Sequence, residues 1–134
     1  MSENNQTSNY KVFIVDDDKF LLDMYALKFS KSGASVENAL NGTDALRKIE
    51  AGYRPDVLLI DVVMPGLSGL DMIAEIRKKK LIEKVPIVVL SNQSEDASIQ
   101  RAKDLGVQGY IVKASTIPSE VVEQINKIVE ESRK

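Results

Sequence analysis

The sequence predicts an α/β protein with a doubly wound parallel sheet, because short apolar runs alternate with longer amphipathic segments along the chain. The runs VFIV, VLLI and IVVL are continuously apolar, as expected for strands that helices cover on both faces. We expect five strands alternating with five helices, joined by right-handed crossovers. A length of 134 residues suits one domain.

The first strand and helix follow a polar segment. Residues 1–9 contain no apolar core, so we expect a disordered lead-in there and a single domain over residues 10–134. After the strand Val12–Val15, a helix is predicted over Lys19–Lys31, and Gly33 ends it. This helix carries one apolar stripe of Phe20, Met24 and Leu27, with Leu21 and Tyr25 beside it.

The next two elements are a weak strand and a short helix. Residues 34–39 contain Val36 as their one large apolar residue, which indicates an edge strand. Asn41-Gly42 predicts a turn, and Thr43 is the expected N-cap of a helix that carries Ala45, Leu46 and Ile49. Gly52 and Pro55 then precede the strand Val57–Ile60.

The second half repeats the alternation. After the loop VVMPGLSG, a helix from Leu70 to about Lys79 is expected to turn inward Leu70, Ile73, Ala74 and Ile76. The strand Ile87–Leu90 leads to a polar helix over Glu95–Leu105, whose thin apolar side contains only Ala97, Ile99, Ala102 and Leu105. The strand Tyr110–Val112 and a helix after Pro118 complete the fold, the helix facing the core with Val121, Ile125, Ile128 and Val129.

Composition excludes several kinds of chemistry. The chain has no cysteine and no histidine, so it has no thiolate or imidazole metal site and no Ser-His-Asp or Cys-His triad. A net charge of -2 gives no electrostatic footprint for direct nucleic-acid binding. No stretch approaches the roughly 18 apolar residues of a membrane span. We therefore expect a cytoplasmic protein.

Four of the predicted strands end at a side chain capable of chemistry: Asp16, Asp61, Ser91 and Lys113. The carboxyl ends of parallel strands share one edge, where ligands bind in open α/β sheets. Three carboxylates there, on Asp16, Asp17 and Asp61, require a cation, and oxygen ligands with few protein groups suit Mg²⁺. This equipment fits phosphoryl transfer to an aspartate, with Mg²⁺ and Lys113 binding phosphoryl oxygens and the Ser91 hydroxyl donating to another.

The motifs FIVDDD, LLIDVVMPGLSG, VVLS and YIVK, in this order, resemble the receiver domain of bacterial response regulators of the chemotaxis type. The resemblance implies a flavodoxin-like sheet of order 2-1-3-4-5. It also implies that Asp61 is the phosphoacceptor, that Asp17 and Asp61 bind the metal directly, and that Asp16 acts through water. Further implied roles are a metal-binding backbone carbonyl at Val63, a switch pair at Ser91 and Tyr110, and a phosphate-binding Lys113.

The chain departs from the common family pattern at several positions. Ala114 follows Lys113 where the family often has a cis proline, which leaves the geometry of that peptide open. Asn92 stands where a smaller residue is usual and is expected to narrow access to the site. Val63 and Gln93 occupy positions that tune phosphoryl lifetime in the family, and residues 114–118 form an unusual segment beside the output surface.

The resemblance implies a switch in a two-component system or phosphorelay. A histidine kinase or phosphotransfer protein donates to Asp61, and the face made of the fourth helix, fifth strand and fifth helix changes to bind another protein. We expect self-directed phosphotransfer and autodephosphorylation rather than enzymatic turnover, and a monomer or a phosphorylation-dependent dimer. The expected form is a stand-alone receiver, unless the chain is a fragment of a longer regulator.

Three other functions compete with this one. A receiver-fold interaction module that works without phosphorylation is the main alternative. An aspartate-nucleophile phosphatase is disfavoured because Val63 stands where such enzymes place a second aspartate. A nucleotide-binding flavodoxin-like protein is disfavoured because no glycine-rich loop follows the first strand.

Overall fold

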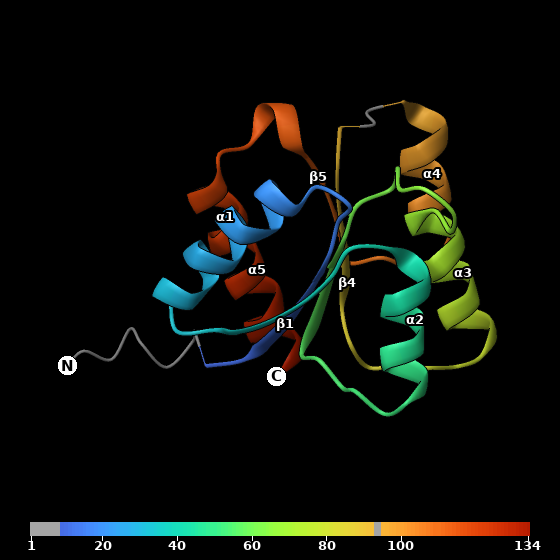
Figure 1. Cartoon of the computed structure of the whole chain (residues 1–134), viewed down its shortest axis with the longest axis horizontal. Coiled ribbons are helices and arrows are strands. Elements are labelled where there is room, and N and C mark those ends of the chain that lie inside the picture. The colour runs from blue at the N-terminus through green and yellow to red at the C-terminus, as the bar shows by residue number, and fades with distance from the viewer. Residues whose placement is uncertain (1–8, 93–94) are drawn as a thin grey trace.

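The fold is a five-stranded parallel sheet with helices on both faces, shown in the computed structural model of the chain (Figure 1). The structure describes residues 9–92 and 95–134. The strands are β1 (Lys11–Val15), β2 (Ser35–Ala39), β3 (Val57–Ile60), β4 (Ile87–Ser91) and β5 (Gly109–Val112). Their order in the sheet is β2-β1-β3-β4-β5. The predicted fold and strand order are therefore confirmed, with β2 at an edge as expected.

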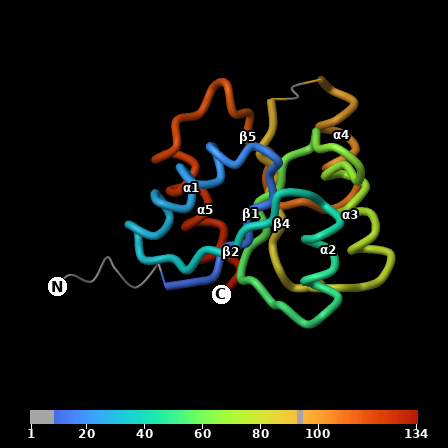
Figure 2. The backbone as a smooth tube through the Cα atoms, in the orientation of Figure 1, coloured from blue at the N-terminus to red at the C-terminus, as the bar shows by residue number. Residues whose placement is uncertain are grey.

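The described residues form five α-helices, in agreement with the prediction, and a short 3-10 turn. They are α1 (Lys19–Lys31), α2 (Gly42–Glu50), α3 (Gly69–Lys78), α4 (Asp96–Asp104) and α5 (Pro118–Ser132), with η2 at Lys113–Ser115. Helices α1 and α5 cover one face of the sheet, and α2, α3 and α4 cover the other (Figures 1 and 2). Because all strands are parallel, the loop that follows each strand lies at the carboxyl edge of the sheet.

Two apolar cores result from the alternation of side chains along the central strands. In β1, Phe13 and Val15 pack with α2 and α3, whereas Val12 and Ile14 pack with α1 and α5. Strand side chains point alternately to the two faces, so a run that is apolar at every position can fill both cores. All four residues of β3 are buried, which fixes the strand that leads to Asp61.

Helix α1 has the predicted bounds, but two of the three residues in the predicted apolar stripe, Phe20 and Leu27, face solvent, whereas Met24 packs partly against the core. Phe20 is 80% exposed and Leu27 is 56% exposed, whereas Leu22, Tyr25 and Phe29 are buried. The helix has two apolar stripes, and the one that includes Phe29 packs on the sheet. An amphipathic helix normally buries its apolar stripe, so the exposed stripe formed by Phe20 and Leu27 is an unusual surface.

Other helix details differ from the prediction. Asn41, not Thr43, caps α2: its extended backbone aims its side chain at the N–H of Asp44, 2.8 Å away. In α3, Met72 is buried and Ala74 only partly so. In α4, all of which is described, Ala102 is the one buried residue and Ala97 is exposed.

The two ends of the described chain meet beside β1. The Tyr10 hydroxyl donates to Asn126 Oδ1 at 2.6 Å, and Arg133 Nη2 donates to the Asn9 carbonyl at 3.1 Å. The predicted lead-in lies, apart from residue 9, outside the described residues. No helix in the described part of the chain is long and apolar enough to cross a membrane.

Candidate functional site

The four predicted strand ends do converge on one edge of the sheet. The register pairs Val15 with Ile60, so that Asp16 and Asp61 leave neighbouring strands at the same level. Ser91 pairs with Val112 and so lies beside the exit to Lys113. A small cavity of about 210 Å³ opens there, lined by Asp61, Val63, Ser91, Asn92 and Lys113.

The acidic cluster has the composition of a site for a hard cation. Asp16, Asp17 and Asp61 each offer a carboxylate oxygen, and these oxygens lie within 4.8 Å of one another. Asp16 and Asp61 are buried and Asp17 is exposed. Three carboxylates at this separation repel one another unless a cation is shared among them, and oxygen ligands select hard ions such as Mg²⁺.

Asp16 and Asp18 have structural contacts that help to form the cluster. Asp16 Oδ1 accepts from the N–H of Asp18 at 2.9 Å, and Asp16 Oδ2 accepts from Lys113 Nζ at 2.8 Å. The Asp18 side chain accepts from the N–H groups of Phe20 and Leu21 as the N-cap of α1. The sequence interpretation gave Asp18 no role, although an aspartate directly before a helix signals a cap. Both Asp16 oxygens are thus engaged, which suits the indirect metal role that the resemblance implies for Asp16.

Lys113 bridges the two buried carboxylates. Its Nζ lies 2.8 Å from Asp16 Oδ2 and 3.4 Å from Asp61 Oδ2, and its side chain is only 12% exposed. Burial acts to lower the pKa of Lys113, but the hydrogen bond to Asp16 and the charge of Asp61 outweigh it and raise that pKa. The lysine therefore stays charged and acts as an internal counter-ion in the pocket.

The environment of Asp61 disfavours the charged form of its carboxyl group. Burial raises the pKa of the Asp61 carboxyl, and Asp16 adds to this effect; the opposing effects of Lys113 and of a hydrogen bond from the backbone of Val62 are smaller together. A carboxylate that is partly desolvated and lies beside a lysine can act as a nucleophile toward a phosphoryl group.

Ser91 and Tyr110 are brought into contact. Ser91 is only 1% exposed at the end of β4, and Tyr110 on the neighbouring β5 is half-buried. Burial raises the pKa of the Tyr110 hydroxyl, and a hydrogen bond with Ser91 opposes that rise. The predicted switch pair is therefore connected directly, while switching itself stays a prediction. Gln93 lies outside the described residues.

The exit from β5 adopts a trans geometry. The described residues contain no cis peptide bond, so the peptide between Lys113 and Ala114 is trans. Lys113–Ser115 forms the 3-10 turn η2, in which the Ser115 hydroxyl donates to the Val112 carbonyl at 3.3 Å. The lysine thus reaches the pocket without proline in the following position.

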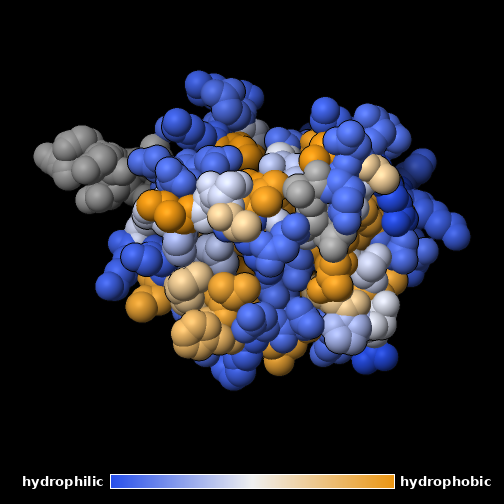
Figure 3. Space-filling model, turned by 90° about the horizontal axis from the view of Figure 1, so that it is seen from above, coloured by the Kyte–Doolittle hydropathy of each residue, from blue (hydrophilic) through white to orange (hydrophobic). Residues whose placement is uncertain are grey.

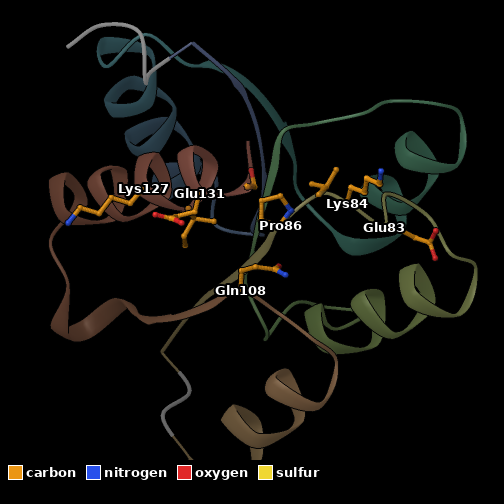
Figure 4. Close-up of a pocket in the computed structure, with 9 residues that line it drawn as sticks. Glu83, Lys84, Pro86, Gln108, Lys127 and Glu131 are labelled. Atoms are coloured by element: carbon orange, nitrogen blue, oxygen red, sulfur yellow. The ribbon is translucent and has the colours of Figure 1, made fainter. Parts of the chain in front are cut away.

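A larger cavity, of about 620 Å³, lies at the other end of β4 (Figure 4). It lies between the loop that precedes β4 and the last turns of α5, and Pro86, Gln108 and Ile128 are among its lining residues. The Gln108 side chain is already bonded, since its Oε1 accepts from the N–H of Ile87 at 2.7 Å. The charged lining residues of the cavity are Glu83, Lys84, Lys127 and Glu131 (Figure 4). Among the described residues, three potential metal ligands gather only at the acidic cavity, which is therefore the candidate site.

The protein family follows from comparison with known proteins. Residues 12–126 match the family model described as the response regulator receiver domain. The chain belongs to this family. It is therefore a receiver domain of the kind found in two-component response regulators, whose signalling depends on phosphorylation.

Relatives of two kinds are found. The chain is 35% identical over 119 residues to the chemotaxis protein CheY of Thermotoga maritima, covering 88% of this chain and 96% of CheY. It is 31% identical over 126 residues to the transcriptional regulatory protein ResD of Bacillus subtilis, covering 93% of this chain but 50% of ResD. The chain thus spans about half the length of such transcriptional regulators.

Among solved structures, the response regulator protein TrrA of Thermotoga maritima, in complex with Mg²⁺ and BeF, is similar to this chain. Its TM-score is 0.77 at 30% sequence identity, with 90% of this chain and 99% of TrrA covered. The likeness extends over the whole receiver fold.

Proposed function

We propose that this receiver domain accepts a phosphoryl group on Asp61 in a Mg²⁺-dependent reaction, from a histidine kinase or a phosphotransfer protein. The observation that carries the proposal is the convergence of Asp61, the Asp16–Asp17 pair and Lys113 around one small cavity. The similar TrrA structure is a complex with Mg²⁺ and BeF, which supports a role for Mg²⁺ in this chain.

The residues of the pocket divide the chemistry among them. The Asp61 carboxylate attacks the phosphorus of the donor, the new P–O bond forms and the bond to the donor's leaving atom breaks. Asp17, Asp61 and the Val63 carbonyl would hold Mg²⁺, which would supply positive charge to neutralise the phosphoryl oxygens. Lys113, already 3.4 Å from Asp61, pairs with one of these oxygens, and the Ser91 hydroxyl donates to another.

The output passes from Ser91 to Tyr110. A phosphoryl group on Asp61 adds negative charge and acceptor oxygens, for which the Ser91 hydroxyl leaves its bond with Tyr110. The face made of α4, β5 and α5 then favours a second arrangement that binds a downstream protein. This change is a population shift, bounded by how much better the phosphoryl group binds the second arrangement.

A silent interaction module is the less favoured function. That alternative would be favoured if Asn92 closed the site, but Asn92 is exposed and the cavity that it lines stays open beside Asp61.

We propose further that the protein works in the cytoplasm. We also propose that it is no turnover enzyme, because its phosphotransfer and autodephosphorylation are directed at itself.

The donor docks, in this proposal, on the exposed apolar stripe of α1. Only Lys19 separates Phe20 from the acidic run Asp16–Asp18, and Leu27 continues its face of the helix. Val63 and Ile117 are exposed on the loops after β3 and β5. The face at the carboxyl ends of the strands shows such apolar patches among polar side chains (Figure 3). Exposed apolar patches with polar surroundings mark protein interaction sites.

Intact mass spectrometry after incubation with a small phosphodonor, with and without Mg²⁺, tests the acceptor. The wild type is expected to gain the mass of one phosphoryl group only with Mg²⁺, and Asp61→Asn to gain none. Asp23→Asn, which changes an exposed aspartate of α1, is the matched control and should be phosphorylated normally. Mg²⁺ binding without any mass gain from small donors or kinases would favour the silent module.

Phosphotransfer from a purified histidine kinase tests the docking stripe. Phe20→Ala and Leu27→Ala should slow transfer from the kinase more than they slow transfer from a small phosphodonor, because the small donor has no docking surface. Leu40→Ala, at an exposed apolar residue outside the stripe, should not change the ratio of the two rates. Equal slowing with both donors would remove the stripe from the proposal.

A further inference from the structure

Gly69 lies against the backbone of the proposed phosphoacceptor. It is the first residue of α3, and a Cβ atom built on it would lie 2.0 Å from the Asp61 carbonyl oxygen and 2.8 Å from the carbonyl carbon. Its own N–H donates to the Val62 carbonyl at 2.8 Å. A backbone oxygen cannot rotate away as a side chain can, so this contact leaves room for glycine alone.

The contact closes the loop that follows Asp61. Residues 62–68 leave the sheet after Asp61 and return to it at Gly69, where the Ser68 hydroxyl accepts from the N–H of Asp71 at 3.2 Å and starts α3. The loop therefore begins and ends at the same point. The position of α3 and the orientation of the Asp61 carbonyl are set together.

The orientation of this carbonyl bears on the Asp61 side chain. The carbonyl of Asp61 and the N–H of Val62 belong to one planar peptide group, which is bonded to the same Cα atom as the carboxylate side chain. A side chain at position 69 that pushes the carbonyl aside must rotate or shift the whole peptide group. This movement turns the Asp61 Cα atom, and with it moves the carboxylate from its place beside Lys113.

We propose that Gly69 is a positioning residue for phosphoryl transfer, which holds the Asp61 carboxylate through the peptide group between Asp61 and Val62. The proposal rests on the function of Asp61 as phosphoacceptor. Gly69 touches no phosphoryl group itself. It acts by permitting α3 to begin in contact with the Asp61 backbone.

Gly42 offers a matched control in the same chain. It is the first residue of α2, and a Cβ atom on it would lie 2.9 Å from the carbonyl oxygen of Leu67 and 3.3 Å from the Leu67 Cβ. Gly42→Ala thus introduces the same methyl group against the same loop. The contact is with Leu67, however, so the peptide group after Asp61 is not pushed.

The experiment compares Gly69→Ala, Gly42→Ala and the wild type in three measurements. These are the phosphorylation rate per folded molecule at saturating Mg²⁺ and small phosphodonor, the Val62 amide resonance by NMR, and the free energy of unfolding. Because a displacement of about 1 Å can cost on the order of 10²-fold in rate, we expect a loss of that order for Gly69→Ala. The Val62 resonance should move as its peptide group is displaced, and Gly42→Ala should lower stability alone.

The outcomes separate this proposal from the function on which it rests. A Gly69→Ala protein with the wild-type rate per folded molecule and an unmoved Val62 resonance overturns the proposal, as does an equal loss of rate in Gly42→Ala. Failure of the wild type to be phosphorylated overturns the acceptor function instead. In that case the Val62 resonance still tests whether Gly69 positions the peptide group after Asp61. Sucrose and low temperature keep a destabilised Gly69→Ala folded for these measurements.

Discussion

Helices α3 and α4 cover the same face of the sheet but are attached to it in different ways. Helix α3 buries four large side chains, Leu70, Met72, Ile73 and Ile76, and begins in contact with the Asp61 backbone. Helix α4, which is described throughout, buries only Ala102, and its N-cap Glu95 makes no side-chain capping bond. Helix α3 follows the strand that leads to Asp61, and α4 follows the strand that ends at Ser91.

Helix α4 is attached to α3 by polar contacts more than by buried side chains. Arg77 donates through Nε to the Leu105 carbonyl at 2.8 Å and through Nη2 to the Gly106 carbonyl at 3.0 Å, at the carboxyl end of α4. Arg101 Nη2 donates to Asp71 Oδ1 at 2.7 Å. Helices with few buried contacts open at low free energy, so Asp61 lies beside a firmly attached helix and Ser91 beside an adjustable one.

The largest expected difference between the two helices is in core substitutions. Ile73→Ala empties a fully buried position and should lower the free energy of unfolding by about 2–5 kcal/mol. Ile99→Ala in α4 removes a half-buried side chain and should cost no more than about 1 kcal/mol. Urea unfolding followed by circular dichroism measures both. Equal losses would show that α4 is anchored as firmly as α3.

An intermediate effect is expected at the arginine that links the helices. Arg77→Ala removes two charged hydrogen bonds to carbonyls and should cost about 1–2 kcal/mol. The loss should appear chiefly as faster hydrogen exchange in α4, with exchange in α3 little changed. Arg47→Ala, at an exposed arginine of α2, serves as the control. A uniform rise in exchange over both helices would contradict an attachment specific to α4.

The smallest effect concerns the ion pair of Asp71 with Arg101. The hydrogen bond from Arg101 holds the pKa of Asp71 below its ordinary value of 3.8. A depressed pKa gives stability that is present above pH 3.8 and is lost as the pH falls through the folded pKa. Both side chains are about half exposed, so we expect only about 0.2–0.5 kcal/mol, reduced further by salt.

An NMR titration of the Asp71 carboxyl group measures this pair. Arg101→Gln should return the pKa of Asp71 toward 3.8. The variant should be slightly less stable than the wild type above pH 3.8, and this difference should disappear in acid. Lys103→Gln removes a charge from the same helix but not from the pair, and should leave the titration unchanged. An unchanged titration in Arg101→Gln would show that the pair does not form in solution.

The sheet is largely predictable from the sequence because its strands are apolar at every position. For a run such as Val57–Ile60, the buried face need not be predicted, because side chains on both faces are buried. For a helix, the buried face must be predicted. In α1 this prediction fails because Phe20 and Phe29 lie on different stripes of the helix, and both stripes are apolar. Only the shape of the sheet beneath decides that Phe29 is buried and Phe20 exposed.

The candidate site was predictable in its members but not in its contacts. Strand ends and motif order bring Asp16, Asp61, Ser91 and Lys113 together, because parallel strands end at one edge. The sequence could not indicate that Lys113 bridges Asp16 and Asp61, since this depends on side-chain geometry. The close approach of Gly69 to the Asp61 backbone also depends on geometry. Its one sign in the sequence is a glycine directly before Leu70.

The bond between Arg133 and the Asn9 carbonyl has a practical consequence for protein engineering. Since the Arg133 side chain reaches the Asn9 backbone, a short peptide can join residue 9 to residue 134 in a chain cut back to residues 9–134. New termini can then be opened at Gly52, a surface position where an added Cβ atom would meet nothing within 4 Å. Such a circular permutant would keep both cores and the acidic pocket while moving the attachment point for a reporter to the far side of α2.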